Sequence, residues 1–377
     1  MSAKLIKKLG EMVAIDSRTS ISNAQVIALV AGWLKNYPQE KQEWVNEDGV
    51  KGENLIVKIK GQSSDVSLVF LCHLDTVPPN DEWETNPFIL EEQGGNLYGL
   101  GACDTKGGIA ALIEALSQLS QVPAFDTYFV FDGDEEQTSL GAQKFLKRMN
   151  IKNPFFIALE PTDGKVLIGQ RSIIKLDITT HGIPQHSSYG TPEKNGKENA
   201  TYKLLSIMKM LEEDAAILAQ EKDVFLGTNT QNFGTIHAGT ARNVFAGKAT
   251  LQMERRLLPT RDMKEEIERI KKLVLQVDPK AEIAISGGIE RGFSTPKDSA
   301  FAKEVLAICT NHISSMTFGT FQAWSEAGLT SLYGPSLILG PGSIGLAHRA
   351  NEYVNAQELF HFVTIFKEIM QSTALAK

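Results

Sequence analysis

The chain has 377 residues, a length typical of two domains or of one large domain with an insertion. Hydrophobic residues make up 42% of it and charged residues 22%, which is the composition of an ordinary soluble globular protein. The 38 basic and 45 acidic residues give a formal net charge of −7 without a basic patch, so nucleic acid and anionic membranes are not expected partners.

The N-terminal segment, residues 1–17, predicts an amphipathic helix because Leu5, Leu9 and Met12 recur at helical spacing among lysines. It lacks the continuous apolar stretch and cleavage site of a secretion signal. No later run approaches the roughly 18 apolar residues of a membrane span. The 3 cysteines are too few and too scattered for a disulfide framework. We therefore expect a reduced, cytoplasmic protein without a membrane partner.

Strand-like runs alternate with helix-like segments over most of the chain, a pattern that predicts an α/β fold with a mostly parallel sheet. The expected strands cover 66–72, 127–131, 154–159 and 335–340. The expected helices cover 106–119, 139–149 and 355–371.

Between these parts the pattern changes. Residues 172–182 and 247–257 alternate with the period of half-exposed strands, and the segments 199–213 and 263–277 are amphipathic. We therefore expect an inserted α+β domain at 172–288. It would interrupt a catalytic, metal-binding domain made of 1–171 and 289–377.

The first predicted strand ends in "CHLD". His73 and Asp75 are two residues apart and project to the same side of an extended chain, which suits a metal-binding histidine whose second ring nitrogen is held by a carboxylate. A packed or surface histidine is the alternative. Cys72 should point to the opposite face as a small buried residue, and Cys103 is also expected to be buried.

Carboxylates or a histidine follow the other predicted strands and the glycine-rich turn. Asp104 lies in "YGLGACDTKGG", which lacks the residues of a phosphate-binding loop, so the alternatives are a ligand and a helix N-cap. Glu160 precedes Pro161, which favours an extended conformation at the strand end. His348 follows the last strand and a glycine turn.

"FDGDEE" crowds four carboxylates into five positions at the end of the strand 127–131. A solvated, salt-bridged loop is the simple interpretation. Because ligand-type residues follow several strand ends, and such ends meet at one edge of a parallel sheet, we favour a metal site. Two histidines and three carboxylates suit one or two zinc ions, which an Asp such as Asp104 can bridge. One of Glu135 and Glu136 can then ligate while the other remains a base for water.

These motifs, in their order and approximate spacing, resemble the M20 family of metal-dependent aminoacylases and peptidases. The quoted motifs are "HLDTVP", "YGLGACDTKGG", "DGDEE", "LEPT", "QHSS" and "GPGSIGLAHRANEY". The resemblance implies that one zinc is held by His73, Asp104 and Glu160, and a second by Asp104, Glu136 and His348. It further implies that Asp75 orients the first histidine and that Glu135 is the general base. Cobalt is expected to substitute for zinc.

The same resemblance identifies the insertion as a lid and dimerisation domain. His186 would reach across a homodimer to polarise the scissile carbonyl of the substrate. Asn243 and Arg256 would hold carboxylate and carbonyl groups of the substrate, an arginine being able to bind a carboxylate through two hydrogen bonds. Without the resemblance, His186 is better explained as a surface histidine, and Asn243 and Arg256 are equally explained by a polar contact or salt bridge at the rim.

Within the family, the sequence is most similar to the deacetylases of N2-acetyl-L-ornithine, an arginine-biosynthesis reaction, and of N-acetylcitrulline. A small N-acyl amino acid is the expected partner. Succinyl-diaminopimelate desuccinylase and dipeptidases remain alternatives, as does a relative that only binds, although Glu135 is present. "AWSEAGL" (323–329) resembles a deacetylase segment and lacks the desuccinylase pattern.

Overall fold

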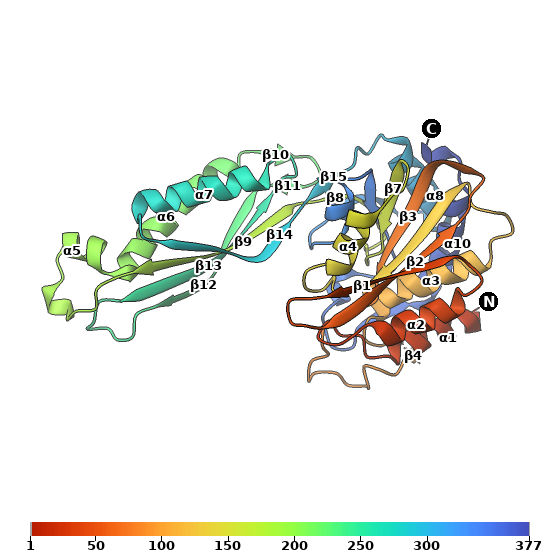
Figure 1. Ribbon diagram of the computed structural model, residues 1–377, viewed down its shortest axis with the longest axis horizontal. Helices are drawn as coiled ribbons and strands as arrows, with labels where there is room; N and C mark the ends of the chain where they lie inside the picture. The colour runs from red at the N-terminus through yellow and green to blue at the C-terminus, as the bar shows by residue number, and fades with distance from the viewer. Residues whose placement is uncertain (1, 377) are drawn as a thin grey trace. The chain divides into compact units, whose positions relative to one another are not determined.

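The computed structural model of the protein describes residues 2–376, with the side chains of 3–287 and 290–376 (Figure 1). The chain forms two compact units, one of Met1–Gly169 with Phe293–Lys377 and one of Gln170–Gly292. The sequence places the ends of the insertion at 172 and 288. In the described part of the chain no helix combines the length and apolarity needed to cross a membrane.

The discontinuous unit is built on a nine-stranded sheet in the order β1-β2-β6-β3-β7-β17-β8-β15, with β16 beside β8. Its centre is parallel and consists of β6 (Phe125–Asp132), β3 (Ser63–His73), β7 (Pro154–Ala158) and β17 (Ser336–Ile338). The predicted mostly parallel sheet is confirmed. The flanking strands are β1 (Gln39–Val45), β2 (Lys51–Ile59), β8 (Lys165–Gln170), β15 (Phe293–Ser294) and β16 (Thr317–Phe321).

Helices cover both faces of this sheet because its central strands are apolar on both sides. Along β3, Phe70 and Cys72 pack into the larger core, while Val69 and Leu71 pack into a second core on the other face. Cys72 is fully buried, as expected, and Cys103 is buried too. The helices of this unit are α1 (Ser2–Val13), α2 (Ala24–Trp33), α3 (Gly107–Ser117), α4 (Leu140–Arg148), α8 (Ala300–His312), α9 (Ala327–Thr330) and α10 (Ala356–Gln371).

A small sheet joins two distant segments of the same unit. β5 (Asn96–Tyr98) pairs with β4 (Glu91–Gln93) on one side and with β18 (Tyr353–Asn355) on the other. Short 3₁₀ turns cover Ile344–Leu346 and Ala374–Ala376, while the turn Ala102–Lys106 contains two residues, Asp104 and Thr105, with non-helical backbone angles. This sheet adjoins two predicted ligand loops, because β5 precedes the loop of Asp104 and β18 follows the loop of His348.

The unit Gln170–Gly292 has a four-stranded antiparallel sheet in the order β12-β13-β9-β14. α6 and α7 lie on one face of it (Figure 1). β13 alternates buried and outward-facing residues, as the sequence predicts. The elements of this unit are β9 (Ser172–His181), α5 (Pro192–Glu198), α6 (Ala200–Leu218), β10 (Lys222–Asp223), β11 (Gly227–Thr228), β12 (Thr230–Ala238), β13 (Lys248–Leu257), α7 (Met263–Val277), β14 (Glu282–Glu290) and a turn at Ser187–Tyr189.

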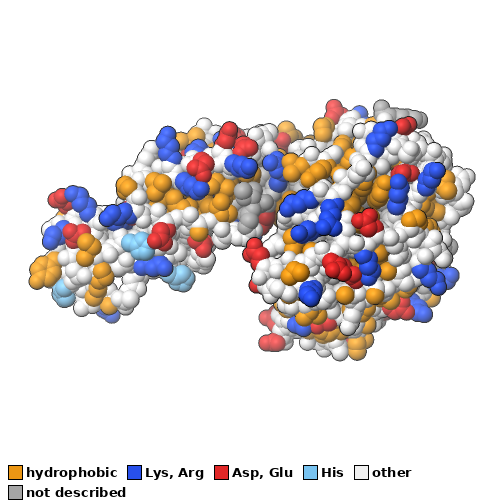
Figure 2. All heavy atoms as spheres, viewed as in Figure 1, with side chains coloured by type: hydrophobic (Ala, Val, Ile, Leu, Met, Phe, Trp, Pro, Cys, Tyr) orange, Lys and Arg blue, Asp and Glu red, His pale blue; other side chains and the backbone are white. Residues whose placement is uncertain are grey.

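The surface of this unit exposes several large apolar side chains. On α6, Tyr202, Leu205 and Ile217 are 47%, 61% and 66% exposed. Figure 2 shows hydrophobic side chains on the visible face of the unit, with acidic and basic side chains interspersed among them.

Candidate metal centre

The parallel strands of the discontinuous unit bring their carboxyl ends to one edge of the sheet. β3 ends at His73, which lies beside Asp132 of β6, and Leu71 lies beside Ala158 of β7. Glu160 follows two residues after β7. The sheet itself therefore places this histidine and this carboxylate close together, although 87 positions separate them in the chain.

The first ligand trio consists of His73, Asp104 and Glu160, whose ligand atoms all lie within 4.8 Å of one another. Nε2 of His73 is 3.2 Å from Oδ1 of Asp104 and 3.9 Å from Oε2 of Glu160. All three side chains are buried, with between 2% and 7% of each exposed. This is the set of residues that the sequence assigns to one zinc ion.

The second trio consists of Asp104, Glu136 and His348, again with ligand atoms within 4.8 Å of one another. Nε2 of His348 is 2.9 Å from Oε2 of Glu136 and 3.6 Å from Oδ2 of Asp104. Asp104 thus presents one carboxylate oxygen to each trio. His348 is 53% exposed and has a positive φ of 61°, a conformation that is uncommon outside glycine.

Asp75 links the first histidine to the adjacent glutamates. Its backbone carbonyl is 3.2 Å from Nδ1 of His73, and its carboxylate oxygen Oδ1 is 3.6 Å from the same nitrogen. The two carboxylate oxygens accept the backbone N–H groups of Glu135 and Glu136 at 3.3 and 3.2 Å. One buried carboxylate therefore fixes the backbone of both glutamates relative to the histidine.

The electrostatics of the cluster favour a cation. Burial and then the carboxylates of Asp104 and Glu135 raise the pKa of Glu160 well above its usual value. Burial lowers the pKa of His73, but hydrogen bonds with Asp104 and Asp75 outweigh it and raise that pKa. Buried carboxylates with raised pKa values need nearby positive charge in order to stay ionised.

Among the described residues, no lysine or arginine forms an ion pair that would supply this charge to the three carboxylates of the trios. The ion pairs of Asp104, Glu136 and Glu160 there are with histidines, and none is with Lys or Arg. Two histidines and three carboxylates, with no cysteine among them, form a donor set that suits a divalent cation such as zinc. Glu135 belongs to neither trio, so its carboxylate remains available for another role.

Three predicted site residues lie in the other unit, Gln170–Gly292. His186 and Asn243 are neighbours there, because the backbone N–H of Ser187 donates to the carbonyl of Asn243 at 2.9 Å. Nδ1 of His186 accepts the backbone N–H of Ser188 at 3.2 Å. A neutral imidazole in this arrangement carries its proton on Nε2 and offers it as a donor.

Arg256 lies far from this pair within the same unit. It is near the end of β13, paired with Ile173 of β9, whereas Lys248 at the start of β13 pairs with His181. The eight residue steps from Lys248 to Arg256 span roughly 26 Å at about 3.3 Å per residue. Nε of Arg256 donates to Glu254 at 2.7 Å. His186 follows β9 at the His181 end of this ladder and bridges Val244, so the length of β13 separates it from Arg256 along the sheet.

Sequence reasoning gave no role to three buried carboxyls beside the cluster. Glu352 accepts three backbone N–H groups of the loop that ends in Asp104. Asp132 ends β6 beside His73, and burial raises its pKa to about 8. Glu326 is buried behind the same edge, and burial followed by the charge of Asp132 raises its pKa. The sequence offered a signal for two of them: Glu352 lies four residues after His348, and Glu326 lies in "AWSEAGL".

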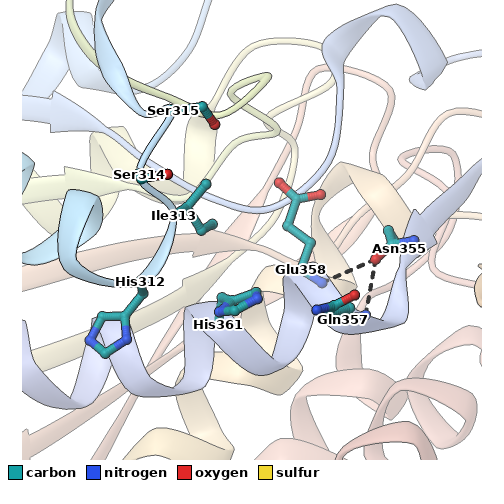
Figure 3. A pocket seen from close by; sticks show the side chains of 8 residues that line it. All are labelled: His312, Ile313, Ser314, Ser315, Asn355, Gln357, Glu358 and His361. Carbon is teal, nitrogen blue, oxygen red and sulfur yellow. Dashed lines mark hydrogen bonds between the residues drawn. The ribbon is translucent and has the colours of Figure 1, made fainter.

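A pocket of about 360 Å³ between the end of α8 and the start of α10 shares no residue with the cluster (Figure 3). Asn355 caps α10 there by accepting the backbone N–H groups of Gln357 and Glu358 at 3.0 and 3.1 Å. The pocket is lined by His312, Ile313, Ser314, Ser315, Asn355, Gln357, Glu358 and His361. None of the predicted site residues is among them.

Comparison with known proteins relates the whole chain to one group of enzymes. The model of "Peptidase family M20/M25/M40" matches residues 69–372. An acetylornithine deacetylase of Myxococcus xanthus is 28% identical over 93% of this chain and 92% of its own length. One of Vibrio cholerae (O395) is 28% identical over 94% and 93%.

Solved structures share the fold at lower identity. Aminopeptidase PepT of Bacillus cereus superposes with a TM-score of 0.78 at 19% identity, covering 98% of both chains. YXEP of Bacillus subtilis, described as a dinuclear metal binding peptidase, gives 0.66 at 15% identity and covers 97% of both chains.

Proposed function

The chain belongs to peptidase family M20/M25/M40, a family of metal-dependent hydrolases, and we propose that it removes the acetyl group from the α-nitrogen of an amino acid, with N2-acetyl-L-ornithine as the substrate. The observation that carries the proposal is the pair of ligand trios sharing Asp104, with Glu135 beside them and outside both. The 28% identity to acetylornithine deacetylases over most of both chains supports the choice of substrate.

We assign one divalent cation to His73, Asp104 and Glu160 and a second to Asp104, Glu136 and His348. Zinc is the preferred ion for this donor set, and cobalt would replace it. When bound, such cations would polarise the acyl carbonyl and make water more acidic. The remaining chemistry belongs to the side chains.

Glu135 is the proposed general base. Its carboxylate takes a proton from the attacking water and passes it to the nitrogen as the amide C–N bond breaks, giving acetate and the free amine. Burial and the adjacent Glu136 carboxylate raise the pKa of Glu135, and a more basic carboxylate suits this proton transfer. Asp75 accepts the backbone N–H of Glu135 and faces the ring of His73, so it fixes the position of the proposed base relative to the proposed metal ligand.

His186 is the proposed donor to the developing oxyanion, because its Nδ1 already accepts a hydrogen bond and the proton therefore lies on Nε2. Asn243 and Arg256 are the proposed contacts for the substrate's carboxylate. Since His186 follows β9 at the end where β13 begins, and Arg256 lies near the other end of β13, the proposed active site takes His186 and Asn243 from one chain and Arg256 from the other chain of a homodimer. The apolar side chains exposed on α6 fit such an association.

The decisive experiment compares kcat/KM for a panel of substrates after loading the metal-depleted protein with zinc. The panel holds N2-acetyl-L-ornithine, N-acetylcitrulline, N-succinyl-diaminopimelate and a dipeptide, and the free amine released is measured. We expect acetylornithine to give the highest value. A higher value for acetylcitrulline would move the assignment to that deacetylase, and a preference for the last two would remove the deacetylase assignment. Glu135→Gln, prepared in parallel, controls for contaminating hydrolases.

The proposal places this reaction in the cytoplasm and in arginine biosynthesis. The biosynthetic assignment is tested by growth: an arginine-requiring mutant that lacks its own acetylornithine deacetylase is compared with and without this chain. Failure to restore growth, despite activity on acetylornithine in vitro, would contradict the biosynthetic assignment.

A further inference from the structure

The second ligand trio depends on two loops that are distant in sequence. Asp104 comes from the loop after β5, and His348 from the loop before β18. The first trio differs, because His73 and Glu160 come from the ends of strands in the central sheet. The pairing of β5 with β18 brings these two loops side by side, and further contacts must fix the residues between that pairing and the two ligands.

The side chain of Glu352 joins these two loops. Oε1 accepts the backbone N–H groups of Cys103 and Asp104 at 2.8 and 2.9 Å, and Oε2 accepts that of Gly101 at 3.0 Å. The backbone carbonyl of Glu352 also accepts the N–H of Gly99 at 3.0 Å. Only 2% of the residue is exposed, so water does not compete for these bonds.

The other end of the His348 loop is attached to the same turn. Sγ of Cys103 lies 3.4 Å from the carbonyl of Ser343. Gly342 has a φ of 93°, and a Cβ there would lie 2.5 Å from Sγ of Cys103, so only glycine permits this approach. His348 is thus held between one attachment at Ser343 and another at Glu352, both made to the turn that carries Asp104.

Lys106 secures that turn from behind. Its buried ammonium group donates to the carbonyls of Met12 and Ile15 at 3.1 and 3.3 Å, at the end of α1. The turn is therefore fixed to the helical layer on one side, and Glu352 is its connection to the His348 loop on the other.

We propose that Glu352 is a positioning residue that sets the spacing of Asp104 and His348 and so determines the affinity of the second metal site. The inference rests on the two-cation part of the proposed function and is independent of the substrate. It predicts a larger effect on the second site, because weakening the Glu352 bonds loosens both Asp104 and His348 there, whereas the first site shares only Asp104 and keeps His73 and Glu160 at the sheet edge.

The test is Glu352→Gln. A glutamine offers one acceptor oxygen where three N–H groups converge, and its NH₂ group would face at least one of them. Metal-depleted full-length protein is titrated with Co²⁺ by calorimetry, and the absorption spectrum is recorded at each step. In the wild type we expect two ions per chain. In the variant we expect the second dissociation constant to weaken by about 10–100-fold, the usual cost of losing a partner behind a ligand, and the first to change by much less.

Three further variants make the result specific. Glu114→Gln makes the same change at a buried glutamate of α3 that pairs with Lys8 at 2.6 Å, and it should alter neither constant. Glu136→Gln removes a ligand of the second site and should weaken the same step. Glu352→Asp keeps the charge, should weaken the second step less than Glu352→Gln, and decides the question if Glu352→Gln does not fold.

The outcomes separate the inference from the proposed function. If the wild type binds two ions and Glu352→Gln weakens both equally or neither, Glu352 does not set the second site, and the proposed function stands. If the wild type binds fewer than two ions, the two-cation proposal fails and the inference with it. An unchanged melting temperature of the metal-depleted variant, with a weaker second step, would exclude a general loss of stability.

Discussion

The adjacent residues Glu135 and Glu136 should respond oppositely to the same substitution. Their backbone N–H groups are held by the two oxygens of Asp75, so Gln at either position keeps the backbone in place and changes only one carboxylate. Glu136 lies in the second trio with its Oε2 2.9 Å from His348, whereas Glu135 lies in neither trio. The pair thus allows ligand and base to be tested with matched variants.

For Glu135→Gln we expect kcat to fall by about 10²- to 10⁴-fold, the usual contribution of a general base, which corresponds to about 2.7–5.5 kcal/mol in the barrier. Metal content should not change. For Glu136→Gln we expect the second ion to bind more weakly by over about 10-fold, because a ligand is lost and not merely a partner behind one. Excess zinc should then restore part of the activity.

The assay measures metal content by mass spectrometry after dialysis and kcat on the best substrate of the panel, with and without added zinc. The reasoning would be refuted if Glu135→Gln lost its metal and regained activity with excess zinc. Retention of both ions by Glu136→Gln, with a fall in kcat like that expected for Glu135→Gln, would likewise reverse the two roles.

Further outcomes follow from the same contacts. Asp75→Asn should lower kcat/KM by about 10–100-fold, because an amide can accept only one of the two backbone N–H groups well; an unchanged value would contradict its positioning role. His186→Ala and Glu135→Ala should each be inactive, yet after subunit exchange their mixture should recover about a quarter of wild-type activity, since half of the dimers would be mixed and each would hold one intact site. No recovery, despite exchange shown by mass, would place His186 in its own subunit's site or in none. Arg255→Met should lower the free energy of unfolding in urea by about 3 kcal/mol. This is near the low end for a buried ion pair, because Arg269 still pairs with the carboxylates of Asp214 and Glu266. A change below about 1 kcal/mol would argue against the burial of the pair.

The sequence predicts the centre of the fold well because the relevant signals are local. Apolar runs between helical segments mark the parallel strands, and α7 covers the predicted segment 263–277. α6 continues to Leu218, beyond the predicted end at 213. The extension begins with Asp214, which is buried and lies 2.7 Å from Arg255 of β13. The sequence does not show that this arginine neutralises the acid, so Asp214 does not look like a buried helix residue there.

The outer strands of the sheet had no comparable signal. β1 reads "QEKQEWV" and is largely exposed, so its polar sequence predicts neither a strand nor a buried face. Glu352 illustrates the same limit at the site. Its partners are backbone N–H groups 248 to 251 positions away. Every residue except proline has such a group, so the amino-acid sequence does not show which of them Glu352 binds. His348 was predictable because its side chain is itself a ligand type.

Asp104 gives each trio one oxygen of a single carboxylate, so occupancy of the two proposed sites cannot be independent. A cation on one oxygen withdraws charge from the other, while it also orders the loop that both sites use. Whatever factor the first ion imposes on the affinity of the second, the second imposes on the first, because the linkage is reciprocal. Scarcity of the metal would therefore affect both proposed sites together, and a chelator that competes for an ion at the exposed His348 would also change the affinity for an ion at the buried His73.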